Sequence, residues 1–109
     1  MRSAEPDQAA IARLPWRGVI VTAAAGPAVE HDYVSRFFAP GVGVAEDPVT
    51  GSAHTALAPL WSARLGRPDL LGLQASRRGG FVRTRVDGAR VLLTGGAVTV
   101  LDGTLQVTP

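Results

Sequence analysis

The stretch Glu46-Asp47-Pro48-Val49-Thr50-Gly51-Ser52 leads directly into the longest helical pattern of this chain. From Ser52 onward, apolar residues recur at steps of three, four and seven, which indicates a helix with one buried stripe. The members of that stripe are Ala53, Leu57, Leu60, Trp61 and Leu65. Gly66 and Pro68 follow the last of them, and both residue types commonly stop a helix. One central helix is therefore the element around which the rest of the fold must be arranged.

Working outward toward the N-terminus, two apolar runs precede this helix. Gly18 to Ala23 is rich in β-branched residues and predicts a buried strand, and Tyr33 to Phe38 predicts a second strand. Ala39 to Gly51 holds three glycines and two prolines, which favours an ordered loop. Glu5 to Leu14, with a proline in its first turn, predicts a short surface helix.

Short apolar runs also follow the helix, and glycine-containing turn signals separate them. The expected strands are Leu71 to Ser76, Phe81 to Val86, Arg90 to Thr94, Ala97 to Leu101 and Thr104 to Val107. Turns spaced this closely are typical of hairpins in an antiparallel sheet. The predicted fold class is α+β, a curved antiparallel sheet wrapped around one central helix, with residues 1–109 forming a single domain.

Composition excludes several classes of function. The chain has 109 residues, 46% of them hydrophobic, which is enough for one core. It contains no cysteine, so thiolate catalysis is excluded, and its two histidines lack convergent carboxylates, so we expect no metal site. No apolar run reaches membrane-spanning length, so we expect a cytoplasmic protein that does not bind membranes.

Arginine supplies every basic residue, yet the formal charge is only +2. The segment Arg77 to Arg85 superficially resembles an RNA-binding tract. One Arg-Gly-Gly sequence is not a repeat, and the alternation in Phe81 to Val86 instead indicates a half-exposed strand. We therefore expect no nucleic-acid partner. Retention on RNA that salt abolishes would contradict this expectation.

The loop before the central helix combines an acid with an anion site. Pro48 biases Asp47 toward extended backbone and so orients its carboxylate. Thr50, Gly51 and Ser52 open the helix, where unpaired amides and the helix dipole attract an anion such as a substrate carboxylate. An acid or base beside a bound carboxylate suits proton transfer. The alternative is that Asp47 and Ser52 only cap the helix.

Several segments, in order, resemble the PhzF-like isomerases of phenazine biosynthesis, relatives of diaminopimelate epimerase. They are Arg36 to Pro40, Gly43 to Ala53, Gln74 and Arg78 to Gly80. The resemblance covers essentially the whole chain and matches the C-terminal lobe of the family. It implies a single lobe of the diaminopimelate epimerase-like fold and a cofactor-independent isomerase or epimerase of a biosynthetic process.

The resemblance also implies site residues. In the family, the matching loop supplies Asp47 as an acid/base residue, with Ser52 and the helix-start amides near the substrate. We take Asp47 and Glu46 as catalytic candidates, and Thr50, Gly51, Ser52 and Arg36 as candidates for binding a small carboxylated metabolite. Arg36 neutralises the substrate or, equally, braces Glu46.

A full family member has two lobes, and its first lobe supplies a catalytic glutamate and a histidine. We expect the missing half of the site to come from a second copy, as a homodimer, or from a separate first-lobe subunit. A catalytically inactive metabolite-binding or interaction module is the alternative. A hydrolase triad of Ser52, His54 and Asp47 is disfavoured, because residues two apart on a helix point in different directions.

Overall fold

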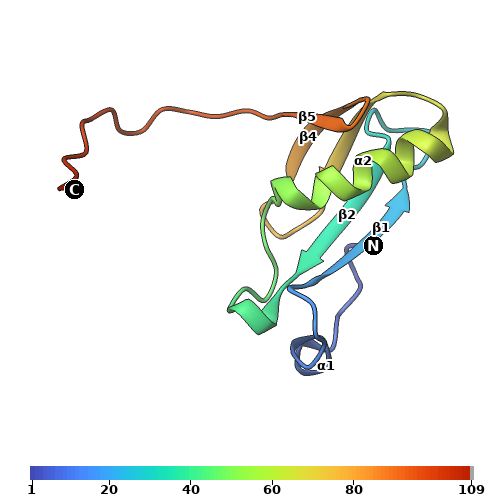
Figure 1. Cartoon of the computed structure of the whole chain (residues 1–109). Helices are drawn as coiled ribbons and strands as arrows, with labels where there is room; N and C mark the ends of the chain where they lie inside the picture. The colour runs from blue at the N-terminus through green and yellow to red at the C-terminus, as the bar shows by residue number, and fades with distance from the viewer. Residues whose placement is uncertain (109) are drawn as a thin grey trace.

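A computed structural model describes residues 1–108 as one five-stranded sheet with a long helix on one face (Figure 1). The strands occur in the order β1-β2-β3-β4-β5 across the sheet. Their bounds are Val19–Ala24 for β1, Tyr33–Phe38 for β2, Asp69–Gln74 for β3, Gly80–Asp87 for β4 and Arg90–Thr94 for β5. The α+β class and the single central helix predicted from the sequence are confirmed.

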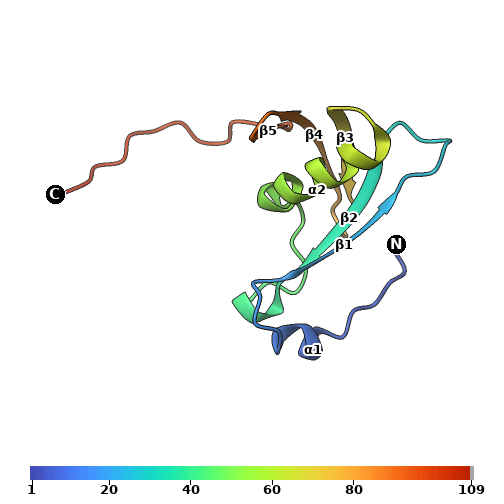
Figure 2. The same ribbon diagram turned by 45° about the vertical axis from the view of Figure 1, so that its right-hand side comes forward.

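Helix α2, Gly51–Leu65, is the central helix. Thr50 is its N-cap residue, and Gly66, with φ of 71°, ends it in the left-handed conformation that favours glycine. The residues that it buries are Ala53, His54, Leu57, Ala58 and Trp61. Leu60 and Leu65 are exposed, so their assignment to the buried stripe was wrong. The sheet covers only one side of the helix, and the stripe is correspondingly narrow (Figure 2).

The core lies between α2 and the concave face of the sheet. Tyr33, Leu57 and Trp61 form its centre, with Ala53 and Leu70 beside them. The rings of Tyr33 and Trp61 stack, with 6.1 Å between their centroids and 6° between their planes. Burial of one large apolar side chain contributes roughly 1.5–3 kcal/mol, so this cluster is the main reason that the helix stays on the sheet.

The sheet is mixed, which corrects the fully antiparallel prediction. Strands β2 and β3 pair in parallel, and the other three neighbouring pairs are antiparallel. Parallel strands need a long crossover, and α2 supplies it between β2 and β3. The glycine-containing turn signals specified the antiparallel β3-β4-β5 meander, but they carried no information about the helical crossover that precedes it.

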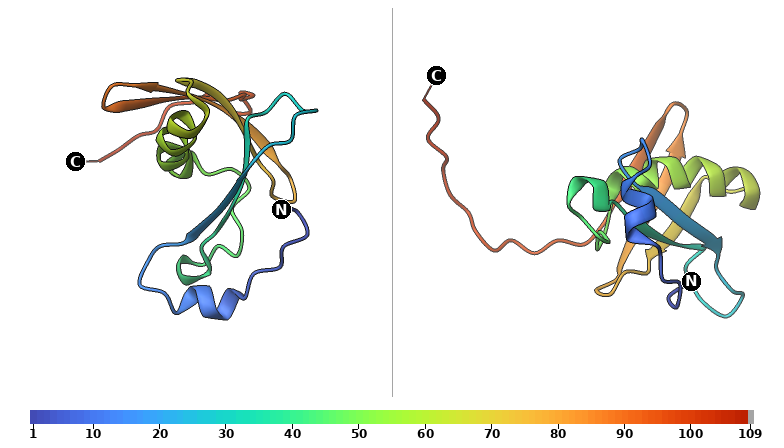
Figure 3. Two further views of the ribbon diagram at one scale, coloured as in Figure 1. Left: turned by 90° about the vertical axis from the view of Figure 1, so that its right-hand side faces the viewer. Right: turned by 90° about the horizontal axis from the view of Figure 1, so that it is seen from below.

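The two ends of the chain also differ from expectation. The N-terminal helix α1 is only Gln8–Ala12, capped by Asp7, and it lies beside the short 3-10 helix η1, Pro40–Val42 (Figure 3). Trp16, expected to pack at a strand entrance, is 69% exposed.

The expected strands Ala97–Leu101 and Thr104–Val107 are not formed. Residues 95–108 instead run away from the body as an extended tail (Figure 1, Figure 3). Among the described residues, no strand pairs with the tail, and a two-stranded hairpin without a third strand is marginally stable in water. Neither α1 nor α2 is long and apolar enough to cross a bilayer.

Candidate active site at the start of helix α2

The loop between η1 and α2 holds Asp47 by its backbone. The Asp47 amide donates to the carbonyl of Phe37 at 3.0 Å, and the Asp47 carbonyl accepts from Gln74 Nε2 at 3.0 Å. Strands β2 and β3 therefore fix both peptide groups of this residue. Pro48 adds a restraint of its own by favouring extended backbone at Asp47. Asp47 is partly buried, and its fixed backbone defines the position from which the carboxylate projects.

The Asp47 carboxylate is joined to the helix start by Thr50. The Thr50 hydroxyl donates to Asp47 Oδ2, so it does not cap α2, and the helix has no side-chain cap. Ser52 and Asp47 likewise make no capping bond in the part of the chain that the structure describes. The capping alternative raised by the sequence therefore does not account for these two residues.

Gln74, fully buried, orients this loop from β3. Its Oε1 accepts from the Thr50 amide at 2.7 Å, and its Nε2 donates to the Thr50 hydroxyl and the Asp47 carbonyl. The orientation of the side-chain amide follows from these partners, because a backbone N–H only donates and a backbone carbonyl only accepts. Thr50 Oγ1 thus accepts one hydrogen bond, from Gln74, and donates another to Asp47.

Behind Gln74, the network continues into the core through His54 and Tyr33. His54 Nε2 lies 3.3 Å from Gln74 Oε1, and His54 Nδ1 lies 2.7 Å from the Tyr33 hydroxyl. Since Gln74 Oε1 only accepts, His54 carries its proton on Nε2 and accepts from Tyr33 at Nδ1. Burial lowers the pKa of His54 and raises the pKa of Tyr33 to about 12, so both are neutral at ordinary pH. Tyr33, His54 and Gln74 therefore form an uncharged hydrogen-bond network that leads to Asp47.

Gly51 and Ser52 are exposed residues in the first turn of α2. Within residues 1–108, neither backbone amide has a hydrogen-bond acceptor, whereas Thr50 donates to Gln74 and Ala53 donates to the Thr50 carbonyl. Unpaired amides with the positive end of the helix dipole form an anion site. Arg17 adds a cation, because its guanidinium donates to Ser52 Oγ at 2.6 Å. Arg17 lies 35 residues away in sequence, and no local motif marked it.

Glu46 and Arg36 form a bidentate ion pair. Arg36 Nε and Nη2 lie 2.8 and 2.9 Å from the two oxygens of Glu46. The remaining nitrogen, Nη1, donates to the carbonyls of Met1, Arg2 and Ala4. The hydrogen bond to Glu46 raises the pKa of Arg36, which remains a cation. Of the two roles that the sequence left open for Arg36, these contacts correspond to the bracing of Glu46.

A depression of about 460 Å³ adjoins the loop, and its lining residues are Glu46, Pro48, Ser76, Arg77 and Arg78. Two of these lining residues are joined by a hydrogen bond, in which the Ser76 hydroxyl donates to the Pro48 carbonyl at 2.7 Å. Arg77 and Arg78 are exposed at its edge and give it a positive rim. The sequence singled out Arg78 in the family resemblance and both arginines in the Arg77 to Arg85 segment, but it did not place either of them near Asp47.

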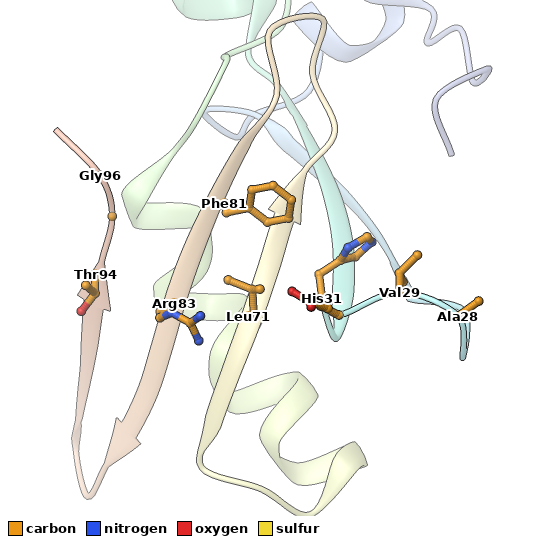
Figure 4. Close-up of a pocket in the computed structure, with 10 residues that line it drawn as sticks. Ala28, Val29, His31, Leu71, Phe81, Arg83, Thr94 and Gly96 are labelled. Carbon is orange, nitrogen blue, oxygen red and sulfur yellow. The ribbon is translucent and has the colours of Figure 1, made fainter. Parts of the chain in front are cut away.

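A larger depression, about 720 Å³, lies elsewhere, on the sheet face that points away from α2 (Figure 4). Leu71, Phe81 and Arg83 line its floor, and the β1-β2 loop supplies His31. The rings of His31 and Phe81 lie 6.0 Å apart. None of the predicted site residues lines this depression, so its size does not make it the catalytic candidate. Across residues 1–108, no three acidic or histidine side chains are grouped as a metal site requires.

The structure therefore brings Asp47, Thr50, Gly51 and Ser52 together at one helix start. Glu46 and Arg36 instead pair with each other, and Arg36 also contacts the N-terminal segment. Gln74, His54 and Tyr33 support Asp47 from three different elements. The spacing of residues could not reveal this network, because it depends on the parallel pairing of β2 and β3.

The sequence of this chain is similar to those of known proteins. The sequence model of the PhzC-PhzF family, described as phenazine biosynthesis-like protein, matches residues 1–103. An uncharacterized isomerase of Pseudomonas aeruginosa is 52% identical over 98% of this chain, which spans 40% of that protein. Mouse phenazine biosynthesis-like domain-containing protein 2 is 53% identical over 82% of this chain, which spans 32% of it.

Solved structures agree with the sequence matches. A PhzF-family protein of Enterococcus faecalis superposes with a TM-score of 0.78 and 42% identity, over 84% of this chain and 35% of the other. A PhzC/PhzF protein of Clostridium difficile gives a TM-score of 0.80 and 36% identity, over 96% and 40%. The chain thus spans about 40% or less of the length of these relatives and matches one lobe of the PhzF fold. By sequence and by structure, this chain belongs to the phenazine biosynthesis-like protein family.

Proposed function

We propose that this chain supplies one half of a cofactor-independent isomerase or epimerase that moves a proton on a small carboxylated metabolite. The observation that carries the proposal is the position of Asp47, whose carboxylate is tied through Thr50 to a helix start with two unpaired amides. An acid/base group next to an anion site is what proton transfer beside a carboxylate requires. The family membership supports the same class of reaction.

In this proposal the substrate carboxylate binds the amides of Gly51 and Ser52, and Thr50 keeps the Asp47 carboxylate oriented. Asp47 removes a proton from a carbon of the bound metabolite, and an acid on a facing body returns a proton at the new position. Arg17 and the positive rim formed by Arg77 and Arg78 favour an anionic substrate before it binds.

Glu46 is adjacent to Asp47 and lines the depression beside the loop, so we retain it as the second catalytic candidate of this chain. Both of its carboxylate oxygens accept from Arg36 in a bidentate pair, which fixes the orientation of the side chain. We assign Arg36 the positioning of Glu46, because its contacts go to that carboxylate and to three backbone carbonyls.

The facing body is, in this proposal, a second copy of the chain. The reaction belongs to biosynthetic metabolism, in keeping with the description of the family, and we propose that it takes place in the cytoplasm. Two symmetric Asp47 carboxylates then need different protonation states, which binding of an asymmetric substrate supplies. A separate first-lobe subunit would serve the same purpose. The second candidate function is a metabolite-binding module without turnover, which would use the same unpaired amides of Gly51 and Ser52.

The test is solvent-proton exchange. The purified chain is incubated in deuterated water with a panel of small carboxylated metabolites, and mass spectrometry measures deuterium at carbon. We expect Asp47→Asn to lower the exchange rate about 10²- to 10⁴-fold, as the loss of a general acid/base does. Asp87→Asn is the matched control, because Asp87 is an exposed residue at the β4-β5 turn and should leave the rate unchanged.

Exchange by Asp47→Asn at the parental rate would contradict the mechanism. Retention of a metabolite in equilibrium dialysis without any exchange, by the parent chain, would favour the binding module.

A further inference from the structure

The outer-face depression, which is the hollow of about 720 Å³ on the sheet face away from α2, has no part in the proposed function. Its volume lies within the range of about 300–1,000 Å³ that is usual for small-molecule sites. Figure 4 shows its floor, which is formed by Leu71 of β3 and by Phe81 and Arg83 of β4. The β1-β2 loop forms one wall, and the end of β5 with Gly95 and Gly96 forms the other.

The depression exists because β4 and β5 do not pair over their whole length. Strand β4 begins at Gly80, but its pairing with β5 begins only where Arg83 lies opposite Thr94. Within residues 1–108, the first three residues of β4 therefore have no partner strand on the side of β5. Gly95 and Gly96, which follow β5, carry no side chains that could fill the space. The hollow is thus a consequence of the strand register.

The floor of the depression presents an aromatic ring to solvent. Phe81 is 57% exposed, and the ring of His31 lies 6.0 Å from the Phe81 ring at an angle of 56°. Leu71 is partly buried and lines the same floor. Aromatic rings pair favourably at centroid separations of about 4.5–7 Å, so the uncovered ring of Phe81 favours a ligand that brings a ring of its own.

The charged residues that line the depression are one cation, Arg83, and one anion, Glu30. Arg83 has a leucine opposite it on β3 and a threonine opposite it on β5, so no acid lies across from it. Asp32 and Asp69 line an adjoining smaller depression together with Arg83, but each is already paired with another arginine. The ion pairs within residues 1–108 include neither Arg83 nor Glu30. The outer-face depression thus offers two unpaired charges of opposite sign.

We propose that the outer-face depression binds a free α-amino acid with an aromatic side chain. The ring of the ligand packs on Phe81, its carboxylate accepts from the Arg83 guanidinium, and its ammonium group donates to Glu30. Leu71 lies between the two charged residues, because it pairs with Arg83 and its backbone bonds to Asp32, two residues after Glu30. One charge of each sign suits a zwitterion and disfavours a phosphate or another polyanion.

This inference goes beyond the proposed function and does not depend on it. Phe81 and Arg83 lie on the exposed side of β4, whereas the alternate residues Val82 and Thr84 are buried. The depression and the start of α2 are therefore on opposite sides of the sheet, and one ligand cannot occupy both.

The test is a titration of the isotope-labelled full chain with L-phenylalanine, followed by two-dimensional NMR of the backbone amides. We expect saturable shifts at Phe81, Arg83, Gly95 and Gly96, which line the depression. Phenylpropionate lacks the ammonium group and phenylethylamine lacks the carboxylate. Each should bind roughly 10-fold more weakly than L-phenylalanine, because each loses one charge-assisted hydrogen bond.

Two variants assign the charged contacts. Arg83→Gln should raise the Kd for L-phenylalanine roughly 10-fold and should not weaken phenylethylamine, which has no carboxylate. Glu30→Gln should weaken phenylethylamine and should not weaken phenylpropionate. Arg85→Gln is the matched control and should keep the parental Kd. Arg85 lies two residues further along the same strand, is paired with Asp69 and does not line the depression.

Three results would overturn the proposal: no saturable shift around the depression, equal affinity for the three ligands, or a parental Kd in Arg83→Gln. Shifts confined to Gly51 and Ser52 would place L-phenylalanine at the start of α2 and would overturn it as well. Binding at the depression without solvent-proton exchange on any metabolite would leave this inference standing and remove the proposed function. Solvent-proton exchange without binding at the depression would do the reverse.

Discussion

Asp47 is held more firmly than a loop residue usually is. Its two backbone groups bond to β2 and to Gln74 of β3, and its carboxylate accepts from Thr50. Phe37 and Gln74 belong to the sheet, and Thr50 is itself bonded to Gln74, so the position of the carboxylate is tied to the sheet. Preorganisation of this kind is what an acid/base residue needs.

The neutral His54 behind this site predicts a pH dependence of stability. In the unfolded chain a histidine binds a proton near pH 6.5, whereas burial lowers the pKa of folded His54. Acid therefore favours the unfolded state, and the stabilisation present above about pH 6.5 is lost as pH falls through the folded pKa. Urea unfolding should show a loss of up to about 1.4 kcal/mol between about pH 7.5 and 5.5.

His54→Gln should remove most of this dependence while lowering stability at both pH values, because glutamine does not titrate. Leu57→Ala, which truncates a buried side chain without removing a titratable group, is the control and should lower stability while keeping the parental slope. An unchanged slope in His54→Gln would show that another group titrates in this window.

At the residue scale, the sequence predicted the loop but only part of its network. Asp47, Thr50 and Ser52 are close in sequence, and their proximity to a helix start was predictable from the helical period and the proline. Gln74, His54 and Tyr33 join them through β2, α2 and β3. Their contacts depend on how strands pair across the sheet, which periodicity does not encode.

At the scale of elements, local patterns located the long helix and the five strands of the sheet. They failed where pairing decides the outcome, at the parallel contact between β2 and β3 and at the two expected tail strands. The parallel contact places Gly72 beside Tyr33, whose ring covers the glycine. This close approach explains why a glycine stands in the middle of a buried strand.

Gly72→Ala tests that contact. A Cβ at Gly72 would lie 2.5 Å from Tyr33 Cζ, so the ring at the centre of the core must move. We expect a loss of about 1–3 kcal/mol in the free energy of unfolding, the usual cost of overpacking. Gly26→Ala is the matched control, since no atom lies within 4 Å of its Cβ position, and urea unfolding should show no loss. Equal stability of the two variants would contradict the packing described for Tyr33.

At the scale of the whole molecule, the chain is one lobe of a fold whose relatives are more than twice as long. The family resemblance, carried by a few motifs, predicted this lobe from the sequence. The open tail and the one-sided cover of α2 were not predictable from local patterns.

The central claim is that a second copy completes this lobe, and the molar mass in solution tests it most directly. Light scattering after size exclusion, over a range of chain concentrations, should give twice the 11.3 kDa mass of one chain at high concentration. The mass should fall toward that of one chain only on dilution. A mass of 11.3 kDa at every concentration would contradict the account.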